Sequence, residues 1–301
     1  MRYDIRTKSV FLLALITLVI LPLAAAQEAP GTQSPSTQTA ANPICGITRI
    51  GRCIEDLAED DKGIFTSPLR LRSRDAYWLM PLGAATGLAF AYDRDAETAE
   101  GFDKGRENTA NTIGDFGSIY VSGGEGAAIY FMGLARHNPK LAETGRLGAE
   151  AVIDSGTVVF AAKLVTNRER PLEGDRKGSF WTNGTGSWTP DSSFPSDHAA
   201  VSMALARVVA GEYPRWQVAV PAYAVAETIG VSRTLANEHF PSDLLVGQTI
   251  GFLTGSYILD HRSLYRGNKR RLAAKVLEST TPIASQRTHT FGAFVEIPVG
   301  H

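Results

Sequence analysis

Two stretches of this chain decide its fold: DSSFPSDHAAVSMALARVVAGEY (residues 191–213) and NEHFPSDLLVGQTIGFLTGSYILDHR (residues 237–262). Both contain Phe-Pro-Ser-Asp and continue into a long, mostly apolar run with poor polar–apolar alternation. Runs of this length and pattern are typical of buried helices, and proline is tolerated in the first turn of a helix. We therefore expect a helix to begin at each tetrapeptide, beside His198 in the first stretch and His239 in the second.

The chain from about Arg74 onward has the same character. Segments rich in Ala, Val, Leu and Gly recur, separated by turn-forming residues, at positions 76–92, 125–137, 149–165 and 215–233. Because each segment is longer than an ordinary strand, we predict an all-α fold. The expected architecture is a compact helical bundle that forms one domain over residues 74–265.

Membrane-spanning helices are not favoured in this domain. The longest uncharged run, residues 76–92, has 17 residues and includes Pro81. A helix that crosses a bilayer needs about 20 mostly apolar residues. Core helices of a soluble bundle fit better, and shallow or peripheral membrane contact stays open.

The first 26 residues have the pattern of a signal peptide. Arg2, Arg6 and Lys8 precede an apolar stretch, and small residues at Ala24 and Ala26 suit cleavage after Ala26. We therefore expect an exported protein of the periplasm or cell envelope. The alternative is a retained membrane anchor.

Residues 27–73 are expected to form a linker. Residues 27–44 are rich in Pro, Ser, Thr and Gln, and EDLAEDDKG (residues 55–63) is expected to be a solvated acidic segment. Cys45 and Cys53 are the two cysteines, and in an oxidising compartment such a close pair most simply forms one local disulfide. Residues 266–301 form a C-terminal tail whose last twelve residues alternate as a strand would.

The overall charge argues against one class of partner. The chain has 30 basic and 31 acidic residues, which give a net charge of −1. Nucleic acid is a polyanion that basic proteins bind. No nucleic-acid partner is therefore expected.

Three cations lie near the ends of apolar segments: Lys163, Arg170 and Arg233. A cation in apolar surroundings needs an anionic partner. Arginine suits bidentate contact with phosphate, and lysine supplies a point charge. Salt bridges to nearby carboxylates, such as Glu169 and Glu173, are the alternative for each cation taken singly.

His239 and Asp243 are four residues apart at the start of an expected helix. From there the carboxylate can reach back to the imidazole. A carboxylate on one ring nitrogen fixes the tautomer and leaves the other nitrogen free to attack. A helix cap by Asp243 or a metal site at the histidine are the alternatives.

The motif residues form a three-part pattern. Lys163 is followed after six residues by Arg170-Pro171, then comes Pro195-Ser-Asp-His198, and then Ser232-Arg233 with His239 and Asp243 at fixed spacing. This pattern resembles the signature of the type 2 phosphatidic acid phosphatase (PAP2) superfamily. That superfamily includes bacterial acid phosphatases, lipid phosphatases and vanadium-dependent haloperoxidases, and the resemblance covers roughly residues 75–260.

The resemblance implies a role for each motif residue. His239 would be the nucleophile that forms a phosphohistidine, Asp243 its orienting carboxylate and His198 the general acid. No metal or cofactor is implied. The implied phosphate site contains Lys163, Arg170, Ser196, Asp197 and Arg233.

Asp197 departs from the pattern, because the superfamily usually has glycine there. An aspartate beside a phosphate is unfavourable unless it points away or is capped. The Pro-Ser-Asp-His variant resembles bacterial undecaprenyl-diphosphate phosphatases, which points to a lipid-linked diphosphate. The lack of clear spanning segments points the other way.

The sequence therefore predicts an exported, metal-independent phosphatase. Its substrate would be a phosphorylated small molecule or lipid, either a phosphomonoester or a diphosphate. A vanadium-dependent haloperoxidase and a non-catalytic, phosphate-binding envelope protein are the alternatives.

Overall fold

A computed structural model describes residues 49–100, 104–174, 176–182 and 191–265 of the chain. The described residues are mostly helical and contain no strand. The predicted all-α class is therefore confirmed for this part of the chain. The expected signal peptide, Cys45 and the C-terminal tail lie outside the described residues.

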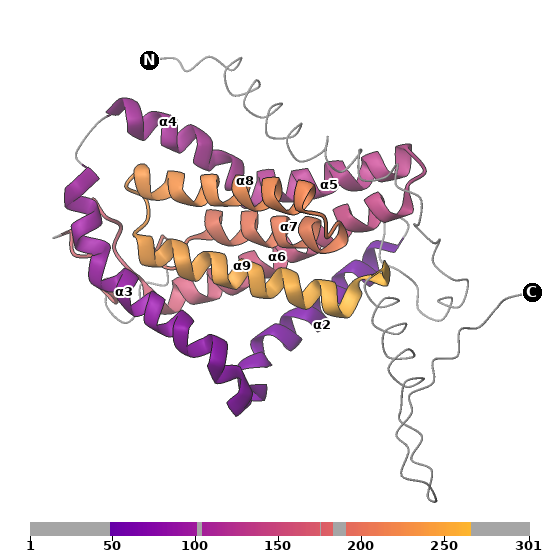
Figure 1. Ribbon diagram of the computed structural model, residues 1–301, viewed down its shortest axis with the longest axis horizontal. Helices are drawn as coiled ribbons and strands as arrows, with labels where there is room; N and C mark the ends of the chain where they lie inside the picture. The colour runs from indigo at the N-terminus through magenta and orange to yellow at the C-terminus, as the bar shows by residue number, and fades with distance from the viewer. Residues whose placement is uncertain (1–48, 101–103, 175, 183–190, 266–301) are drawn as a thin grey trace, which may run out of the picture.

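Five long helices form the bundle, and α7 lies at its centre. α7 packs against α6, α8 and α9, and α5 packs against α6 (Figure 1). Most of α7 is buried, which explains why its sequence is apolar on every side. The five are α5 (Ile119–Ala135), α6 (Pro139–Thr166), α7 (Asp197–Glu212), α8 (Trp216–Leu235) and α9 (Pro241–Arg262).

The longest of these helices, α6, has clear signals at both ends. Asn138 caps it by accepting a hydrogen bond from the Leu141 backbone N–H at 3.0 Å, and Pro139 is its first residue. Asn167 ends it in the left-handed conformation, with φ of 41°. The last turn of α6 therefore brings Lys163 to the same end of the bundle as the start of α7.

Glycines set the close approach of α9 to α7. A Cβ built on each of three α9 glycines would lie only 2.3, 2.0 and 2.8 Å from a backbone carbonyl oxygen of the α7 N-cap or of the first half of α7. Any larger residue would push the helices apart, and the starts of the two helices would separate with them. The pairs are Gly247 with Ser196, Gly251 with Ala200, and Gly255 with Ala204.

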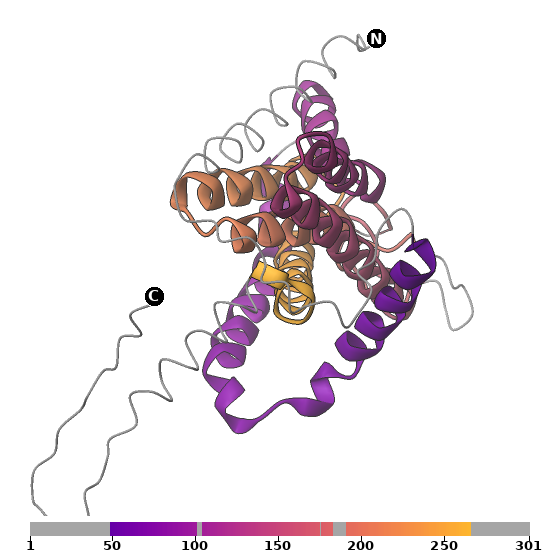
Figure 2. The same ribbon diagram turned by 90° about the vertical axis from the view of Figure 1, so that its right-hand side faces the viewer.

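Two further helices flank the bundle. α3 (Ala76–Glu100) packs against α9, and α4 (Lys104–Gly114), followed by the short turn η4 (Asp115–Gly117), packs against α8. The 3-10 turns η2 (Ser67–Arg70) and η3 (Ser73–Asp75) join α3 to α2 (Ile50–Phe65), and Figure 2 shows α2 and α3 as an arch that projects from the bundle. None of the described helices is both long and apolar enough to cross a membrane.

The N-terminal part of the structure differs from the expected linker. Residues 50–65 form helix α2 (Ile50–Phe65), and two aspartates of the supposedly solvated acidic segment are buried. Asp56 and Asp60 both accept hydrogen bonds from Arg262 of α9, at 2.8 to 3.1 Å. A cation more than 200 positions away thus explains the burial. Cys53 in α2 is disulfide-bonded, and its predicted pairing with Cys45 stays a prediction.

Candidate active site

The three sequence motifs meet at one end of the bundle. Lys163 extends from the last turn of α6, and Arg233 from the last turn of α8. α7 begins at Asp197, one residue before His198, and α9 begins at Pro241, just after His239. Both predicted helix starts are therefore confirmed.

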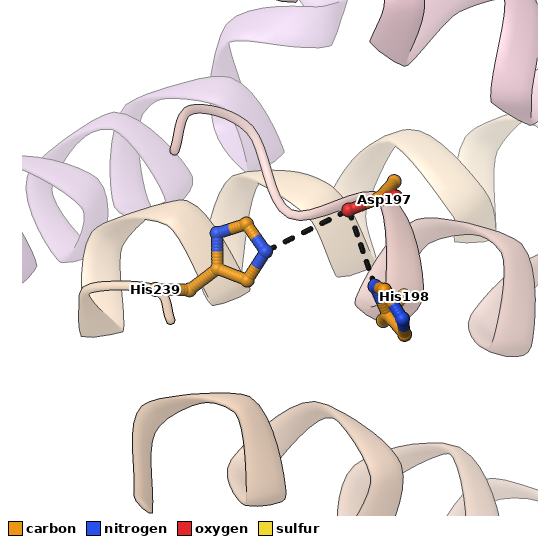
Figure 3. A group of neighbouring side chains, drawn as sticks. All are labelled: Asp197, His198 and His239. Atoms are coloured by element: carbon orange, nitrogen blue, oxygen red, sulfur yellow. Dashed lines mark hydrogen bonds and ion pairs between the residues drawn. The ribbon is translucent and has the colours of Figure 1, made fainter. Parts of the chain in front are cut away.

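The Asp197 carboxylate lies between the two histidines (Figure 3). Its Oδ1 is 3.2 Å from His198 Nδ1, 3.6 Å from His239 Nε2 and 3.4 Å from Lys163 Nζ. The side chain is 41% exposed, whereas that of His239 is almost fully buried. Three groups that can carry positive charge therefore converge on one anionic oxygen.

His239 has a defined tautomer in its neutral form. Its Nδ1 lies 2.7 Å from the backbone carbonyl oxygen of Ser193, which can only accept a hydrogen bond, so Nδ1 carries the proton. The lone pair of the neutral ring is then on Nε2, which faces Asp197. This is the arrangement that a nitrogen nucleophile requires.

Asp243 supports this ring indirectly, which differs from the expected direct contact. The distance from Asp243 Oδ2 to His239 Nδ1 is 3.8 Å, too long for a hydrogen bond. Oδ2 instead accepts hydrogen bonds from the Ser193 hydroxyl and from the Phe240 backbone N–H. Asp243 thereby fixes the residue whose carbonyl orients His239, and it also caps α9.

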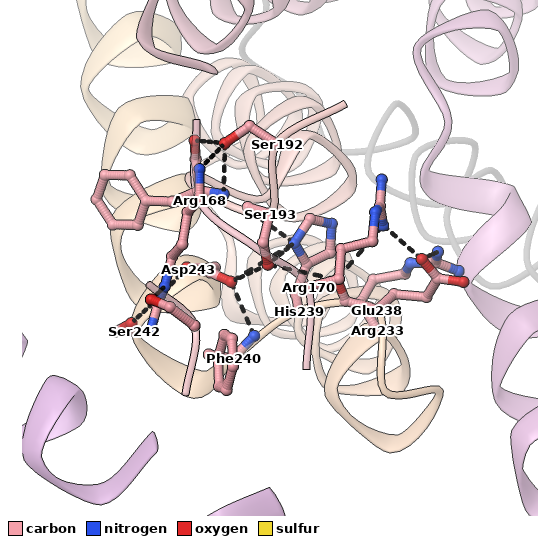
Figure 4. A network of polar contacts seen from close by, with 12 residues as sticks. Arg168, Arg170, Ser192, Ser193, Arg233, Glu238, His239, Phe240, Ser242 and Asp243 are labelled. Atoms are coloured by element: carbon pink, nitrogen blue, oxygen red, sulfur yellow. Dashed lines mark hydrogen bonds and ion pairs between the residues drawn. The ribbon is translucent and has the colours of Figure 1, made fainter. Parts of the chain in front are cut away.

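A buried arginine that the motif pattern did not single out completes this support (Figure 4). Arg168 donates to Asp243 Oδ1, to the Ser242 hydroxyl and to Asp93 of α3. The side chains of Arg168, Asp243 and Asp93 are each at most 3% exposed. Breaking one partner of such a buried set leaves an uncompensated charge, so the network holds α3 and the α9 start in register.

Aromatic rings enclose the same guanidinium. Its central carbon lies 5.2, 5.0 and 4.2 Å from the centroids of three phenylalanine rings, which are those of Phe90, Phe180 and Phe240. Cation–π contacts of this kind favour arginine over a neutral residue. Arg168 therefore has its partners within the protein and stabilises the site without facing the ligand position.

Arg233 has donor capacity to spare. Its Nη1 donates to Asn111 of α4 at 3.1 Å, and its Nη2 is 3.7 Å from Glu238. Its Nε is buried and has no hydrogen-bond partner among the described residues. Burial also lowers the pKa of Arg233, as expected for a cation that has lost water without full compensation. A bound anion could accept a hydrogen bond from Arg233 Nε and balance its charge.

Arg170 is less available than the sequence implied. It donates to Asp191, at 3.0 and 3.3 Å, and to the carboxylate of Glu238. These guanidinium partners differ from Glu169 and Glu173, the carboxylates considered from the sequence, although Glu173 accepts a hydrogen bond from the Arg170 backbone N–H at 3.0 Å. Burial opposes its charge, but Glu238 and Asp191 outweigh that effect and raise its pKa. Glu238 thus joins Arg170 to Arg233 at the rim of the site (Figure 4).

Ser196 lies at the junction of the two helix starts. Its backbone N–H donates to the Asp243 carbonyl at 3.0 Å. It is the N-cap residue of α7, but its side chain makes no capping hydrogen bond. Its Oγ is buried, and the described residues provide it with no partner. The Ser196 hydroxyl therefore does not cap α7, and its hydrogen-bonding capacity is not used by the described residues.

The electrostatic environment affects Asp197 and His198 in linked ways. Burial opposes ionisation of Asp197, but the hydrogen bond with His198, the adjacent ring of His239 and the charge of Lys163 outweigh it and lower the pKa of Asp197. Burial also lowers the pKa of His198, although the Asp197 carboxylate acts in the opposite direction. Asp197 is therefore an anion that favours the protonated form of His198.

A metal ion is a second kind of ligand that these side chains could hold. Asp197, His198 and His239 each place a ligand atom within 4.8 Å of the others. Lys163 and Arg233 set positive charge around the same point, which disfavours a cation and favours an anion. The surroundings therefore fit an anion better than a metal.

Comparison with known proteins agrees with the geometry. Residues 147–263, which carry all the motif residues, match the model of the PAP2 superfamily. This segment is therefore similar to members of the PAP2 superfamily. The resemblance predicted from the three motifs is thereby confirmed.

The curated relatives share one name. A lipid A 1-phosphatase of Rhizobium etli is 32% identical over 136 residues, which cover 41% of this chain and 57% of that protein. A lipid A 1-phosphatase of Porphyromonas gingivalis is 27% identical over 258 residues, which cover 81% of this chain and 48% of that protein. The chain thus spans about half the length of the curated relatives it matches. No solved structure matches it.

Proposed function

We propose that this PAP2 protein is a metal-independent phosphatase that hydrolyses a lipid-linked phosphomonoester or diphosphate through a phosphohistidine. One observation carries the proposal. Nε2 of His239 faces the point on which Lys163 and His198 also converge, and the Asp197 carboxylate occupies that point. A phosphoryl group would replace this carboxylate as the anion among the same donors.

The first chemical step is attack by His239. A nitrogen–phosphorus bond forms at Nε2 while the bond from phosphorus to the leaving oxygen breaks. His198, in its protonated form, gives its proton to that oxygen. The Nδ1–H of His239 stays hydrogen-bonded to the Ser193 carbonyl, which stabilises the positive charge that the ring gains.

The second step releases phosphate. His198, now neutral, takes a proton from a water molecule whose oxygen attacks phosphorus, and the bond to Nε2 breaks. Inorganic phosphate leaves, and both histidines return to their starting states. Lys163 and Arg233 stabilise the charge on the transferring group in both steps, which is the main task in phosphoryl transfer.

The substrate class is proposed from the relatives. Their names state a phosphatase acting at the 1-position of lipid A. A phosphate ester on a lipid is therefore the substrate class that we propose for this chain. Export to the periplasm or envelope, expected from residues 1–26, is part of the same proposal.

Peripheral membrane contact is supported by helix α3. Residues 76–92 carry no charge, and much of this part of α3 is exposed, including Tyr77 and Met80 at 81% and 73%. The exposed arginines Arg70 and Arg72 precede it. Apolar side chains next to basic ones favour the surface of an anionic bilayer. Sedimentation with vesicles that contain anionic lipid, for the protein and its Met80→Asp variant, tests this contact.

Trapping the covalent intermediate tests the reaction itself. Rapid quench of the reaction with a ³²P-labelled lipid phosphate in alkaline denaturant should yield protein-bound label that acid later removes and base does not, as a phosphohistidine requires. The His239→Ala variant should yield none, while His261→Ala, a histidine far from the site, should retain the label. Label retained by His239→Ala would refute the assignment.

The same preparation separates the alternatives. Activity that persists in EDTA supports the metal-independent mechanism, whereas loss with EDTA and recovery with a divalent ion would contradict it. Peroxide-dependent halide oxidation with added vanadate, without phosphate release, would instead identify a haloperoxidase. Phosphate binding without either reaction would identify a non-catalytic protein.

A further inference from the structure

A groove of about 580 Å³ lies between α4 and the C-terminal half of α8. This size is within the range of ligand pockets, about 300–1,000 Å³. The exposed area of its walls is mainly apolar, with Ala110 and Ile113 of α4 facing Val231 and Leu235 of α8, and the charged residues Arg106 and Glu227 also line it. Of the motif residues only Ser232 lines it, and no residue with a role in the reaction proposed above does, so that reaction does not account for the groove.

The groove borders the phosphate site through α8. Ser232 lines the groove, and the next residue, Arg233, extends into the site. Asn111 of α4 accepts the hydrogen bond from Arg233 Nη1, so both walls of the groove take part in placing this cation. A Cβ built on Gly114, the last residue of α4, would lie 2.5 Å from Arg233 Nη1, which shows how closely the end of that wall approaches the guanidinium.

We infer that this groove binds the alkyl chain of a phosphorylated amphiphile whose phosphate lies at Arg233 and His239. The inference rests on the proposed function for the phosphate, and it adds the place where the apolar part of the substrate is bound. The chemistry is complementary, because an apolar chain leaves water for apolar walls while its charged end meets the buried Nε of Arg233.

The inference predicts a dependence on chain length. Each methylene that leaves water for the groove should improve kcat/KM about fourfold, from a burial energy of about 0.8 kcal/mol per CH₂. A series from ethyl to octyl phosphate, used below micelle-forming concentrations, should therefore show a steady rise that levels off when the groove is full. A series of equal rates would contradict the inference.

Two variants on α8 localise the effect. Val231→Asp places a carboxylate in the groove, and Val220→Asp places one on the same helix outside it; both side chains are exposed, which limits the effect on folding. Val231→Asp should flatten the chain-length series, and Val220→Asp should keep it. If kcat/KM of Val231→Asp rises with chain length as steeply as that of the wild type, the chain is bound elsewhere and the inference is overturned.

A binding measurement separates this inference from the proposed reaction. Calorimetric titration with ethylphosphonate and octylphosphonate, whose carbon–phosphorus bonds are not hydrolysed, should show tighter binding of the octyl compound to the wild type. Val231→Asp should reduce that preference at least tenfold, which corresponds to about 1.4 kcal/mol. This result would support binding of the alkyl chain in the groove even if no phosphate ester is hydrolysed. Equal affinities for the two phosphonates would contradict it even if esters are hydrolysed.

Discussion

The two Phe-Pro-Ser-Asp segments have the same four residues but enter their helices in different registers. α7 begins at Asp197, so this aspartate is the first helical residue, whereas α9 begins at Pro241, which makes Asp243 the third. A carboxylate at the third position can reach back to the N–H of the capping residue, and Asp243 accepts that bond from Phe240 at 2.8 Å. Asp197 instead faces the two histidines.

This difference in register separates two tasks. The Asp243 side chain is fully buried in a network with Arg168, while that of Asp197 is 41% exposed. The serines differ in the same way: the Ser242 hydroxyl donates to Asp93 at 2.6 Å, whereas the Ser196 hydroxyl has no partner among the described residues. The second segment builds the support for the site, and in the first segment Asp197 faces the two histidines.

Replacing each aspartate by alanine should give the largest contrast. Asp243→Ala removes a partner of the buried Arg168, and breaking such a buried pair costs about 3–5 kcal/mol. Asp197→Ala removes a partly exposed charge and should cost less than about 1 kcal/mol. Urea denaturation measures both free energies of unfolding. Equal losses of unfolding free energy would mean that Asp243 supports the fold no more than Asp197 does.

The histidines beside the two segments should differ by role. General acid catalysis contributes about 10²-fold or more when the leaving group needs a proton. His198→Ala should therefore slow hydrolysis of an alkyl phosphate by about that factor relative to nitrophenyl phosphate, whose leaving group departs as an anion. His239→Ala should abolish both reactions. The measurement is kcat/KM of both substrates, compared as free energies.

One result would reassign His198. If His198→Ala loses equal activity on the two substrates while formation of the phosphoenzyme is the slow step, the residue is not the general acid. It would then bind phosphate or support the site structurally.

Much of this arrangement could be predicted from the sequence. The helices were long and apolar, and proline marked the starts of α7 and α9, so the bundle and the positions of both histidines followed from local pattern. Motif spacing also predicted the convergence of Lys163, Arg233 and His198 with His239. These features depend on residues that are close in the chain or on a pattern shared with a family.

What could not be predicted depends on long-range contacts. Arg168 reaches Asp93 and Asp243, each 75 positions away, and nothing next to it in the sequence marks it as buried. The burial of Asp56 depends likewise on Arg262. The direct contact of Asp243 with His239 was expected from their spacing, but a third-position aspartate turns towards the capping N–H and Ser193 instead.

A smaller effect tests the contact between the two segments. Gly247→Ala would place a Cβ 2.3 Å from the Ser196 carbonyl oxygen and push the helix starts apart. Overpacking of this kind costs about 1–3 kcal/mol, and activity should fall with it because the Ser196 N–H bond to Asp243 is strained. Gly87→Ala is the matched control, since nothing lies within 4 Å of its added Cβ, and it should be neutral or stabilising by up to about 1 kcal/mol. Thermal unfolding and kcat/KM are measured for both variants. Equal stability and equal activity would mean that the contact between Gly247 and Ser196 tolerates an added Cβ.

The smallest expected effect is a shift in pH dependence caused by Asp197. Burial lowers the pKa of His198, and the Asp197 carboxylate partly offsets this by favouring the protonated ring. A general acid must be protonated, so kcat/KM for an alkyl phosphate should fall as the pH rises through the pKa of His198. Asp197→Asn removes this favourable charge and so lowers the pKa of His198 further. The falling limb of the curve of kcat/KM against pH should therefore move to lower pH. Asp191→Asn is the control, because Asp191 pairs with Arg170 rather than with His198, so the falling limb of this variant's pH profile should stay in place. A limb that stays in place in Asp197→Asn as well, or moves to higher pH, would show that the residue in the usual glycine position does not set the protonation of His198.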